Sequence, residues 1–184
     1  MSKGNVLVKE AMRMNPITVK TKTSVKEAAI LMKKKGIGNC IVVDDKPIGI
    51  ITESDILKKV VAEDLKASEI TVEKIMSTPI IVIDAYVSLE DAVKTMGKCN
   101  IRRLPVLENG ELIGIITQKD ISKISPILHE ISREWYDISV RDEAHLRRQV
   151  FSGKCEDCGT LSTNLKNVDG RLLCEDCIDA LKYQ

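Results

Sequence analysis

The stretch GIITESDIL, residues 49–57, recurs 65 positions later as GIITQKDIS, residues 114–122. Both copies place a threonine three residues before an aspartate, directly after a short apolar run. A side-chain oxygen at this spacing can cap a helix by accepting hydrogen bonds from the free N–H groups of its first turn. The repeated stretch therefore predicts an apolar strand that runs into a helix at two places in the chain.

The similarity between the two copies extends well beyond this motif. Residues 8–57 align with residues 72–122 when single-residue gaps are allowed near Asn15 and Lys46. The matched pairs are Met12 with Met76, Pro16 with Pro79, Ser24 with Ser88, Glu27 with Asp91, Ala28 with Ala92, Met32 with Met96 and Gly49 with Gly114. A period of roughly 64 residues exceeds that of solenoid repeats. We therefore expect two copies of one small unit, packed on each other.

Each copy has the same order of expected elements, which places the chain in the α/β (α+β) class with β-α-β-β-α units. An extended piece follows the proline, a serine then caps an amphipathic helix, two apolar strands flank a turn, and a second helix follows the threonine of the motif. The positions are residues 17–20 and 80–83 for the first strand, Ser24 and Ser88 for the cap, and Thr52 and Thr117 for the second helix. In the second copy the turn contains Asn109-Gly110, a strong hairpin signal.

Four segments are expected along the chain: a first unit over residues 8–66, a second over 70–124, a helical bridge over 125–150 and a four-cysteine segment over 151–184. The bridge begins at Ser125-Pro126 and carries an apolar stripe at helical spacing. The stripe consists of Ile127, Leu128, Ile131, Trp135 and Ile138. We expect this stripe to lean on the paired units.

Composition and charge argue against several classes of function. With 28 basic and 27 acidic residues the formal net charge is +1, so no global attraction to nucleic acid or anionic lipid is expected. Aromatic residues make up only 3% of the chain, which leaves no base-stacking platform. No apolar run approaches the roughly 20 residues that cross a bilayer, and the beginning of the chain does not read as a signal peptide. We expect a cytoplasmic protein with no membrane partner.

The Thr-x-x-Asp motif allows two compatible interpretations. Capping alone is supported by Ser24-x-x-Glu27 and Ser88-x-x-Asp91, which have the same spacing where nothing else suggests a site. A ligand site is the second interpretation, because the free N–H groups of a helix N-terminus favour phosphate and a carboxylate can accept both vicinal hydroxyls of a ribose. The small glycine before each motif would leave space for such a ligand beside the backbone.

The duplicated Gly-Ile-Ile-Thr-x-x-Asp unit, preceded in the second copy by IRRLPV (residues 101–106), resembles a CBS-domain pair, or Bateman module, over residues 8–124. The resemblance implies a pseudo-twofold module, often dimeric, whose clefts bind adenosine-containing ligands such as AMP, ATP or S-adenosylmethionine. It implies ribose contacts by Thr52 with Asp55 and by Thr117 with Asp120. The residues that it implies for the adenine and phosphate region are Ile17, Thr18, Gly38 and Asn39 in the first copy, and Ile80, Ile81, Arg102 and Arg103 in the second.

The two copies differ in the expected phosphate region. Arg102 and Arg103 can hold phosphate oxygens, whereas Gly38 and Asn39 offer no charge. We therefore predict unequal sites, of which the second binds nucleotide more tightly. The alternative for the arginine pair is a solvated or ion-paired surface.

Four of the six cysteines form two Cys-x2-Cys pairs separated by fifteen residues, a spacing typical of zinc sites. These cysteines are Cys155, Cys158, Cys174 and Cys177. Gly159 permits the tight turn that directs N–H groups at sulfur. The segment resembles a zinc ribbon or the rubredoxin knuckles, and with the paired repeats it resembles a protein of archaeal type. We predict a structural zinc ion, with iron as the open alternative, rather than disulfides in a reducing compartment.

No catalytic constellation is evident. His129 and His145 fall in the polar bridge, Cys40 and Cys99 fall in apolar surroundings typical of the core, and no P-loop or dinucleotide motif occurs. We predict a non-enzymatic regulatory module that binds an adenine nucleotide, forms a homodimer and signals to an unknown protein partner.

One alternative is a transcription-related regulator that contacts DNA through the four-cysteine segment and the basic bridge, Arg141, Arg147 and Arg148. It is disfavoured because residues 151–184 contain four basic and six acidic residues, and the resulting net charge of −2 repels phosphate. The other alternative is an electron-transfer protein with an iron site.

Overall fold

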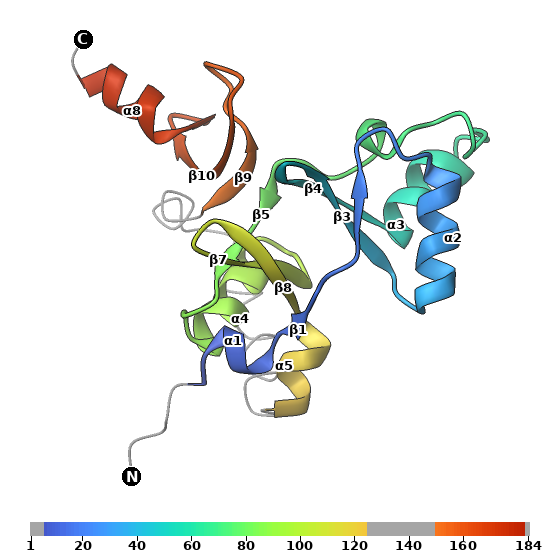
Figure 1. Cartoon of the computed structure of the whole chain (residues 1–184), viewed down its shortest axis with the longest axis horizontal. Helices are drawn as coiled ribbons and strands as arrows, with labels where there is room; N and C mark the ends of the chain where they lie inside the picture. Colours follow the sequence, from blue (N-terminus) through green and yellow to red (C-terminus); the bar gives the residue numbers. More distant parts are fainter. Residues whose placement is uncertain (1–5, 125–149, 183–184) are drawn as a thin grey trace. The chain divides into compact units, whose positions relative to one another are not determined.

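The computed structural model describes residues 6–124 and 150–182 and divides into two compact units (Figure 1). The repeat-one unit comprises Ile17–Ile80, Phe151–Leu165 and Leu173–Gln184; the repeat-two unit comprises Met1–Pro16, Ile81–Val150 and Lys166–Leu172. The predicted bridge, with its apolar stripe, two histidines and three arginines, lies outside the described residues except for Val150.

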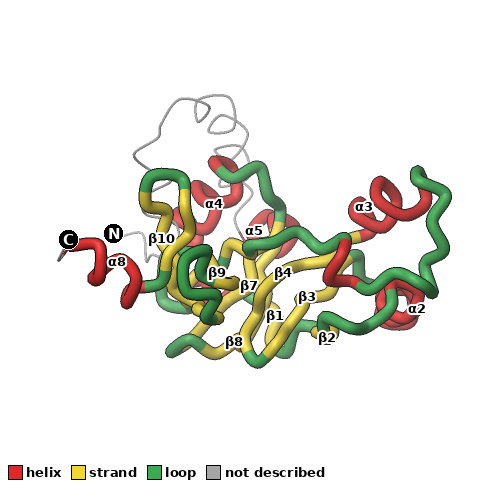
Figure 2. Tube along the Cα trace, turned by 90° about the horizontal axis from the view of Figure 1, so that it is seen from above, coloured by secondary structure: helices red, strands yellow, loops and turns green. Residues whose placement is uncertain are grey.

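The repeat-one unit contains one complete β-α-β-β-α copy. Its elements are β2 (Thr18–Lys20), α2 (Val25–Lys35), β3 (Asn39–Asp44), β4 (Lys46–Thr52), α3 (Glu53–Ile56) with the π-helical turn Leu57–Val61, and the 3-10 turn Val72–Lys74. Strand β3 lies between β2, to which it is parallel, and β4, to which it is antiparallel. Helices α2 and α3 lie beside this sheet (Figure 2). The aliphatic core of the unit includes Val25, Met32 and Ile51.

The repeat-two unit contains the second copy in the same order. Its elements are α1 (Val8–Ala11), β1 (Arg13–Met14), β6 (Ile83–Asp84), α4 (Leu89–Lys98), β7 (Arg103–Glu108), β8 (Glu111–Thr117) and α5 (Gln118–Ile124); β5 (Ile80–Ile81) falls at the division between the units. The sheet order is β1-β8-β7-β6, with β6 parallel to β7 and the other pairs antiparallel. The predicted fold class and the order strand, helix, strand, strand, helix are confirmed in both copies.

Local sequence signals set the ends of these elements. The hydroxyl of Ser24 accepts from the N–H of Glu27 at 3.2 Å, and the Glu27 carboxylate accepts from the N–H of Ser24 at 2.8 Å. At the start of α4 the hydroxyl of Ser88 accepts from the N–H of Asp91 at 3.1 Å. In the β7–β8 turn both Asn109 and Gly110 have positive φ, which the hairpin signal requires. The predicted caps and the predicted hairpin are therefore confirmed.

The segment that leads into each copy packs on the opposite copy. Strand β1 pairs with β8, placing Met14 opposite Gly114, and Ser77 forms a bridge with Ile50 beside β4. A Cβ at Gly114 would lie 2.9 Å from the carbonyl oxygen of Arg13, and one at Gly49 would lie 3.1 Å from that of Ser77. The absence of a side chain at these glycines therefore makes room for the leading segments. The sequence alone suggested that this space would accommodate a ligand. Because each leading segment packs on the opposite copy, the compact units divide at residues 16/17 and 80/81.

The four-cysteine segment contains β9 (Phe151–Lys154), β10 (Leu161–Val168), β11 (Arg171–Leu173) and a helix that was not predicted, α8 (Glu175–Lys182). Strand β9 pairs antiparallel with β10 and packs beside β4. The buried hydroxyl of Ser152 donates to the carbonyl oxygen of Pro47. A Cβ atom added at Gly153 would lie 3.2 Å from the Cβ atom of Pro79. Most of this segment thus belongs to the repeat-one unit. Within the described ranges no helix has the length and apolarity needed to cross a bilayer.

Candidate functional site: two Thr-x-x-Asp corners and a four-cysteine cluster

The second corner, at the junction of β8 and α5, holds a buried carboxylate. One oxygen of Asp120, Oδ2, accepts from the N–H of Thr117 at 3.1 Å and from its hydroxyl at 2.5 Å. The N–H of Asp120 donates to the Thr117 hydroxyl at 3.3 Å. Only 6% of Asp120 is exposed. The capping interpretation of the motif is therefore confirmed.

Arg13 occupies the other oxygen of Asp120. Its Nε and Nη2 atoms both lie 2.9 Å from Asp120 Oδ1, and its side chain is 54% exposed. Burial opposes ionisation of Asp120, but hydrogen bonds from Arg13 and Thr117 outweigh it and hold the pKa of this carboxyl below its usual value. Sequence reasoning missed Arg13 because it lies 107 residues away, in the leading segment of the first copy. Only the exchange of leading segments brings it here.

The first corner is built in the same way but with different partners. Asp55 Oδ2 accepts from the N–H of Thr52 at 3.0 Å and from its hydroxyl at 2.6 Å. Asp55 Oδ1 accepts from Lys59 Nζ at 2.9 Å and from the Ser77 hydroxyl at 3.3 Å. Lys59 also donates to the carbonyl oxygen of Ile75 at 2.7 Å. Burial raises the pKa of Asp55, whereas Thr52 and Lys59 lower it by more, so the net shift is downward.

The two aspartates should make folding stability depend on pH. Because both folded pKa values lie below the usual 3.8, their contribution is complete above that value and is lost as the pH falls through the folded pKa values. We expect the difference in urea midpoint between the wild-type chain and an Asp55→Asn, Asp120→Asn variant to be constant from about pH 7 to about pH 5, and to shrink below about pH 4. Asp44→Asn, at the exposed end of β3, serves as the control. A difference independent of pH would contradict the expectation.

The predicted phosphate-region residues flank the motif in both copies. Arg103 lies opposite Thr117 in the β7–β8 pair, and the carbonyl oxygen of Arg102 accepts from the N–H of Gln118 at 3.0 Å. Arg102 is exposed and Arg103 is half-buried. The structure therefore places the backbones of Arg102 and Arg103 beside Thr117 and Gln118, whereas the side chain of Arg13 contacts Asp120 directly.

The equivalent region of the first corner carries an acid. Asn39 lies opposite Thr52, and the carbonyl oxygen of Gly38 accepts from the N–H of Glu53 at 3.2 Å. A Cβ at Gly38 would lie 2.7 Å from Glu53 Oε2, so this carboxylate lies directly over the glycine. The second copy has the neutral Gln118 at the position of Glu53. The first corner therefore carries one more negative charge than the second, in addition to lacking the two arginines.

In the first strand of each copy, the strand pairing differs by one residue from the pairing expected from the sequence, which set Ile80 and Ile81 beside Ile17 and Thr18. Val19 lies opposite Val42, and Ile83 lies opposite Val106 at the equivalent position of the second copy. Counting back from these pairs, Ile81 corresponds to Ile17 and Val82 corresponds to Thr18. Ile80 precedes this region and is only 3% exposed. Ile17 is half-buried and Thr18 is exposed, next to β3.

A pocket of about 530 Å³ lies between α2 and α3 in the repeat-one unit. Its lining is mostly apolar and includes Met32, Ile56 and Leu57, with Gly38 and Glu53 at one side. Neither Thr52 nor Asp55 lines it. The pocket is therefore distinct from the carboxylate of the first corner.

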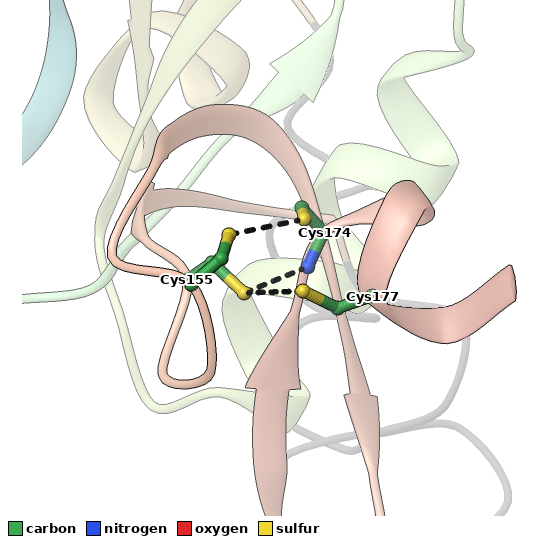
Figure 3. Close-up of side chains that lie close together, drawn as sticks. Cys155, Cys174 and Cys177 are labelled. Atoms are coloured by element: carbon green, nitrogen blue, oxygen red, sulfur yellow. Dashed lines mark hydrogen bonds between the residues drawn. The ribbon is translucent and has the colours of Figure 1, made fainter. Parts of the chain in front are cut away.

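The four cysteines of the C-terminal segment converge as predicted. Figure 3 shows Cys155, Cys174 and Cys177 of this cluster. Cys155 follows β9, Cys174 follows β11 and Cys177 lies in the first turn of α8. All four sulfur atoms lie within 4.8 Å of one another, and the pairs Cys155–Cys177 and Cys158–Cys174 are 3.7 Å apart. A tetrahedral zinc ion with Zn–S bonds of about 2.3 Å holds its sulfurs about 3.8 Å apart. The cluster therefore fits such an ion.

Backbone groups surround the sulfur atom of Cys155. Gly159 has φ +73°, which confirms the predicted tight turn, and the N–H of Cys174 donates to Cys155 Sγ at 3.3 Å. Burial opposes ionisation of Cys155, but hydrogen bonds from the backbone N–H groups of its neighbours outweigh it and lower the pKa of this thiol to about 6. In contrast, burial raises the pKa of Cys40, in β3, to about 11, which fits the predicted core position. Cys99 is half-buried.

The two β-α-β-β-α copies and their paired corners define a duplicated α/β module. The family model of the CBS domain matches residues 8–62 and 72–126, and the chain belongs to the CBS domain family.

Relatives share more than the paired repeats. An uncharacterized protein of Methanopyrus kandleri is 35% identical over 181 residues, covering 95% of this chain and 92% of that protein. An uncharacterized protein of Methanocaldococcus jannaschii is 37% identical over 183 residues, covering 95% of this chain and 94% of that protein. Both alignments extend beyond the two matched CBS domains.

Among solved structures, the chain resembles the CBS domain pair of protein MJ0100 in complex with 5′-methylthioadenosine and S-adenosyl-L-methionine. The TM-score is 0.59 and the identity 34%, over 65% of this chain and 94% of that one.

Proposed function

We propose that this chain is a non-enzymatic regulatory module that binds an adenosine-containing nucleotide chiefly at the second corner. The observation that carries this proposal is the buried, capped carboxylate of Asp120 with the guanidinium of Arg13 paired to it. Arg102 and Arg103, whose backbones lie beside Gln118 and Thr117, are proposed to add positive charge. A carboxylate can accept both hydroxyls of a ribose, and guanidinium groups hold phosphate oxygens. The adenosine ligands of the MJ0100 domain pair support the choice of nucleoside.

The first corner is proposed as the weaker site. It offers the same capped carboxylate on Asp55, but Glu53 lies over Gly38 where the second corner has Arg102. A carboxylate at this position repels phosphate. The partner of Asp55 is the ammonium group of Lys59, which cannot form the two-nitrogen contact that an arginine such as Arg13 can form. The roles of Ile17, Thr18, Asn39 and Ile81 in holding the base remain part of the proposal.

The four-cysteine cluster is proposed to hold a structural zinc ion. Four thiolates around one ion leave no open coordination position for a reacting water, which supports a non-enzymatic role. Iron in place of zinc would give a red protein. The zinc-ribbon assignment, the archaeal type, the cytoplasmic location, the homodimer and the signalling to a protein partner are further parts of this proposal.

A titration of the purified chain with nucleotides tests the proposed function. We expect AMP, ADP, ATP or S-adenosylmethionine to bind and to raise the thermal midpoint, because a ligand that binds only the folded state stabilises it. GMP and CMP, which present the same ribose and phosphate with another base, are the controls. Isothermal titration that detects no adenosine compound at millimolar concentration would overturn the proposal.

A further inference from the structure

We infer that Arg13 makes the second corner select phosphorylated ligands over free nucleosides, by leaving Asp120 when a ribose arrives and pairing with the ligand's phosphate. This inference rests on the proposed function. It assigns the selection to a residue that lies outside the second copy of the motif altogether.

The hydrogen bonds of Asp120 show why an exchange is required. An ionised carboxylate has about four acceptor positions. Thr117 fills two of them with its N–H and its hydroxyl, and Arg13 fills the other two with Nε and Nη2. A ribose that donates two hydroxyls to this carboxylate can bind only when two of the present donors leave.

Arg13 is the partner that can leave. The N–H of Thr117 is fixed by the backbone at the end of β8, and its hydroxyl also accepts from the N–H of Asp120. The Arg13 side chain is long, lies at the surface and is 54% exposed, so water can reach its guanidinium during the exchange. Displacing Arg13 therefore leaves the cap of α5 intact.

The displaced guanidinium then needs a new anion. A nucleotide supplies one, because a phosphate is joined to the same sugar and accepts two parallel hydrogen bonds from an arginine. A nucleoside supplies none, so its ribose replaces an ion pair without compensation. Breaking the Arg13–Asp120 ion pair thus lowers the affinity for adenosine, whereas the released guanidinium of Arg13 raises the affinity for AMP.

The first corner provides the contrast. Lys59 is held by the carbonyl oxygen of Ile75 as well as by Asp55, and Ser77 supplies the remaining donor. A lysine so held cannot form a two-pronged contact with phosphate. Lys59→Gln is therefore the matched control for Arg13→Gln.

The experiment is a calorimetric titration of the full-length, metal-loaded chain with adenosine and with AMP. For Arg13→Gln we expect AMP affinity to fall about tenfold or more, since a charge-assisted contact is lost, and adenosine affinity to stay the same or rise. Arg13→Lys should restore part of the AMP affinity. Lys59→Gln should leave the AMP-to-adenosine affinity ratio of the tighter site unchanged. In the wild-type chain the Arg13 Nε–H resonance should move on addition of either ligand, because both displace it from Asp120.

Three results would overturn the inference. If Arg13→Gln and Arg13→Lys weaken both ligands equally, the residue only supports the corner. If neither variant changes the affinity ratio, phosphate selection lies elsewhere. If the wild-type chain binds adenosine and AMP with equal affinity, there is no selection to assign. Failure of the wild-type chain to bind either compound would overturn the proposed function as well, and is recognised without any variant.

Discussion

Removal of the metal ion should unfold the four-cysteine segment and lower the thermal midpoint of the chain. Structural zinc contributes roughly 10 kcal/mol or more to the folding of small four-ligand sites. Among the described residues of this segment, the large apolar side chains that are buried are Phe151, Leu165, Leu172 and Leu173. Without the ion the four thiols have no common partner, and burial of these side chains alone cannot hold two knuckles together.

The effect should reach the repeat-one unit through β9. Ser152 donates to Pro47, and Gly153 lies against Pro79, so unfolding of β9 exposes one side of the neighbouring strand β4. We expect amide hydrogen exchange after chelation to accelerate first in residues 151–177 and then in residues 46–52. Residues 103–117 of the repeat-two unit should keep their protection, which separates this effect from global unfolding.

Variants and metal analysis complete this test. Cys158→Ser should reproduce the effect of the chelator, whereas Cys99→Ser, outside the cluster, should not. We expect one zinc ion for each chain by elemental analysis. An unchanged melting curve after complete removal of the ion, or disulfides found under reducing conditions, would contradict the structural role.

The sequence carried the local features of this fold because they depend on neighbouring residues. The serine and threonine caps act over three residues, the Asn109-Gly110 turn joins adjacent strands, and the cysteine knuckles close within four residues. Each of these was predicted and is present. The repeat itself was visible because the same residues recur in the same order, about 64 positions apart.

What the sequence could not supply depends on contacts between distant segments. Arg13 reaches Asp120 only because β1 pairs with β8, and no periodic signal marks a segment that packs on the other copy. The role of Gly114 was likewise misjudged, since the leading strand, not a ligand, requires the missing side chain. The attachment of β9 to β4 depends on the small residues Ser152 and Gly153, which carry no pattern of their own.

Asp120→Asn should abolish tight nucleotide binding, whereas Asp55→Asn should change the affinity of the tighter site by less than about threefold. Asparagine keeps the size and one acceptor of aspartate but removes the charge that receives the ribose hydroxyls. Hydrogen bonds to charged groups contribute about 1.5–3 kcal/mol each, so we expect AMP affinity to fall at least about tenfold. Isothermal titration of the two variants beside the wild-type chain measures this difference.

A urea unfolding curve of each variant, measured in parallel, distinguishes loss of nucleotide binding from loss of folding. Arg13 loses its ion pair in Asp120→Asn, but its half-exposed guanidinium remains hydrated, and the Asn side chain can still accept from the N–H of Thr117. The cap of α5 is therefore kept, and the urea midpoint should fall by a similar amount in both variants, since Asp55 and Asp120 are buried and capped alike. Equal loss of nucleotide affinity in the two variants would show that both corners bind alike. Unchanged affinity in Asp120→Asn would show that this carboxylate is a cap and nothing more.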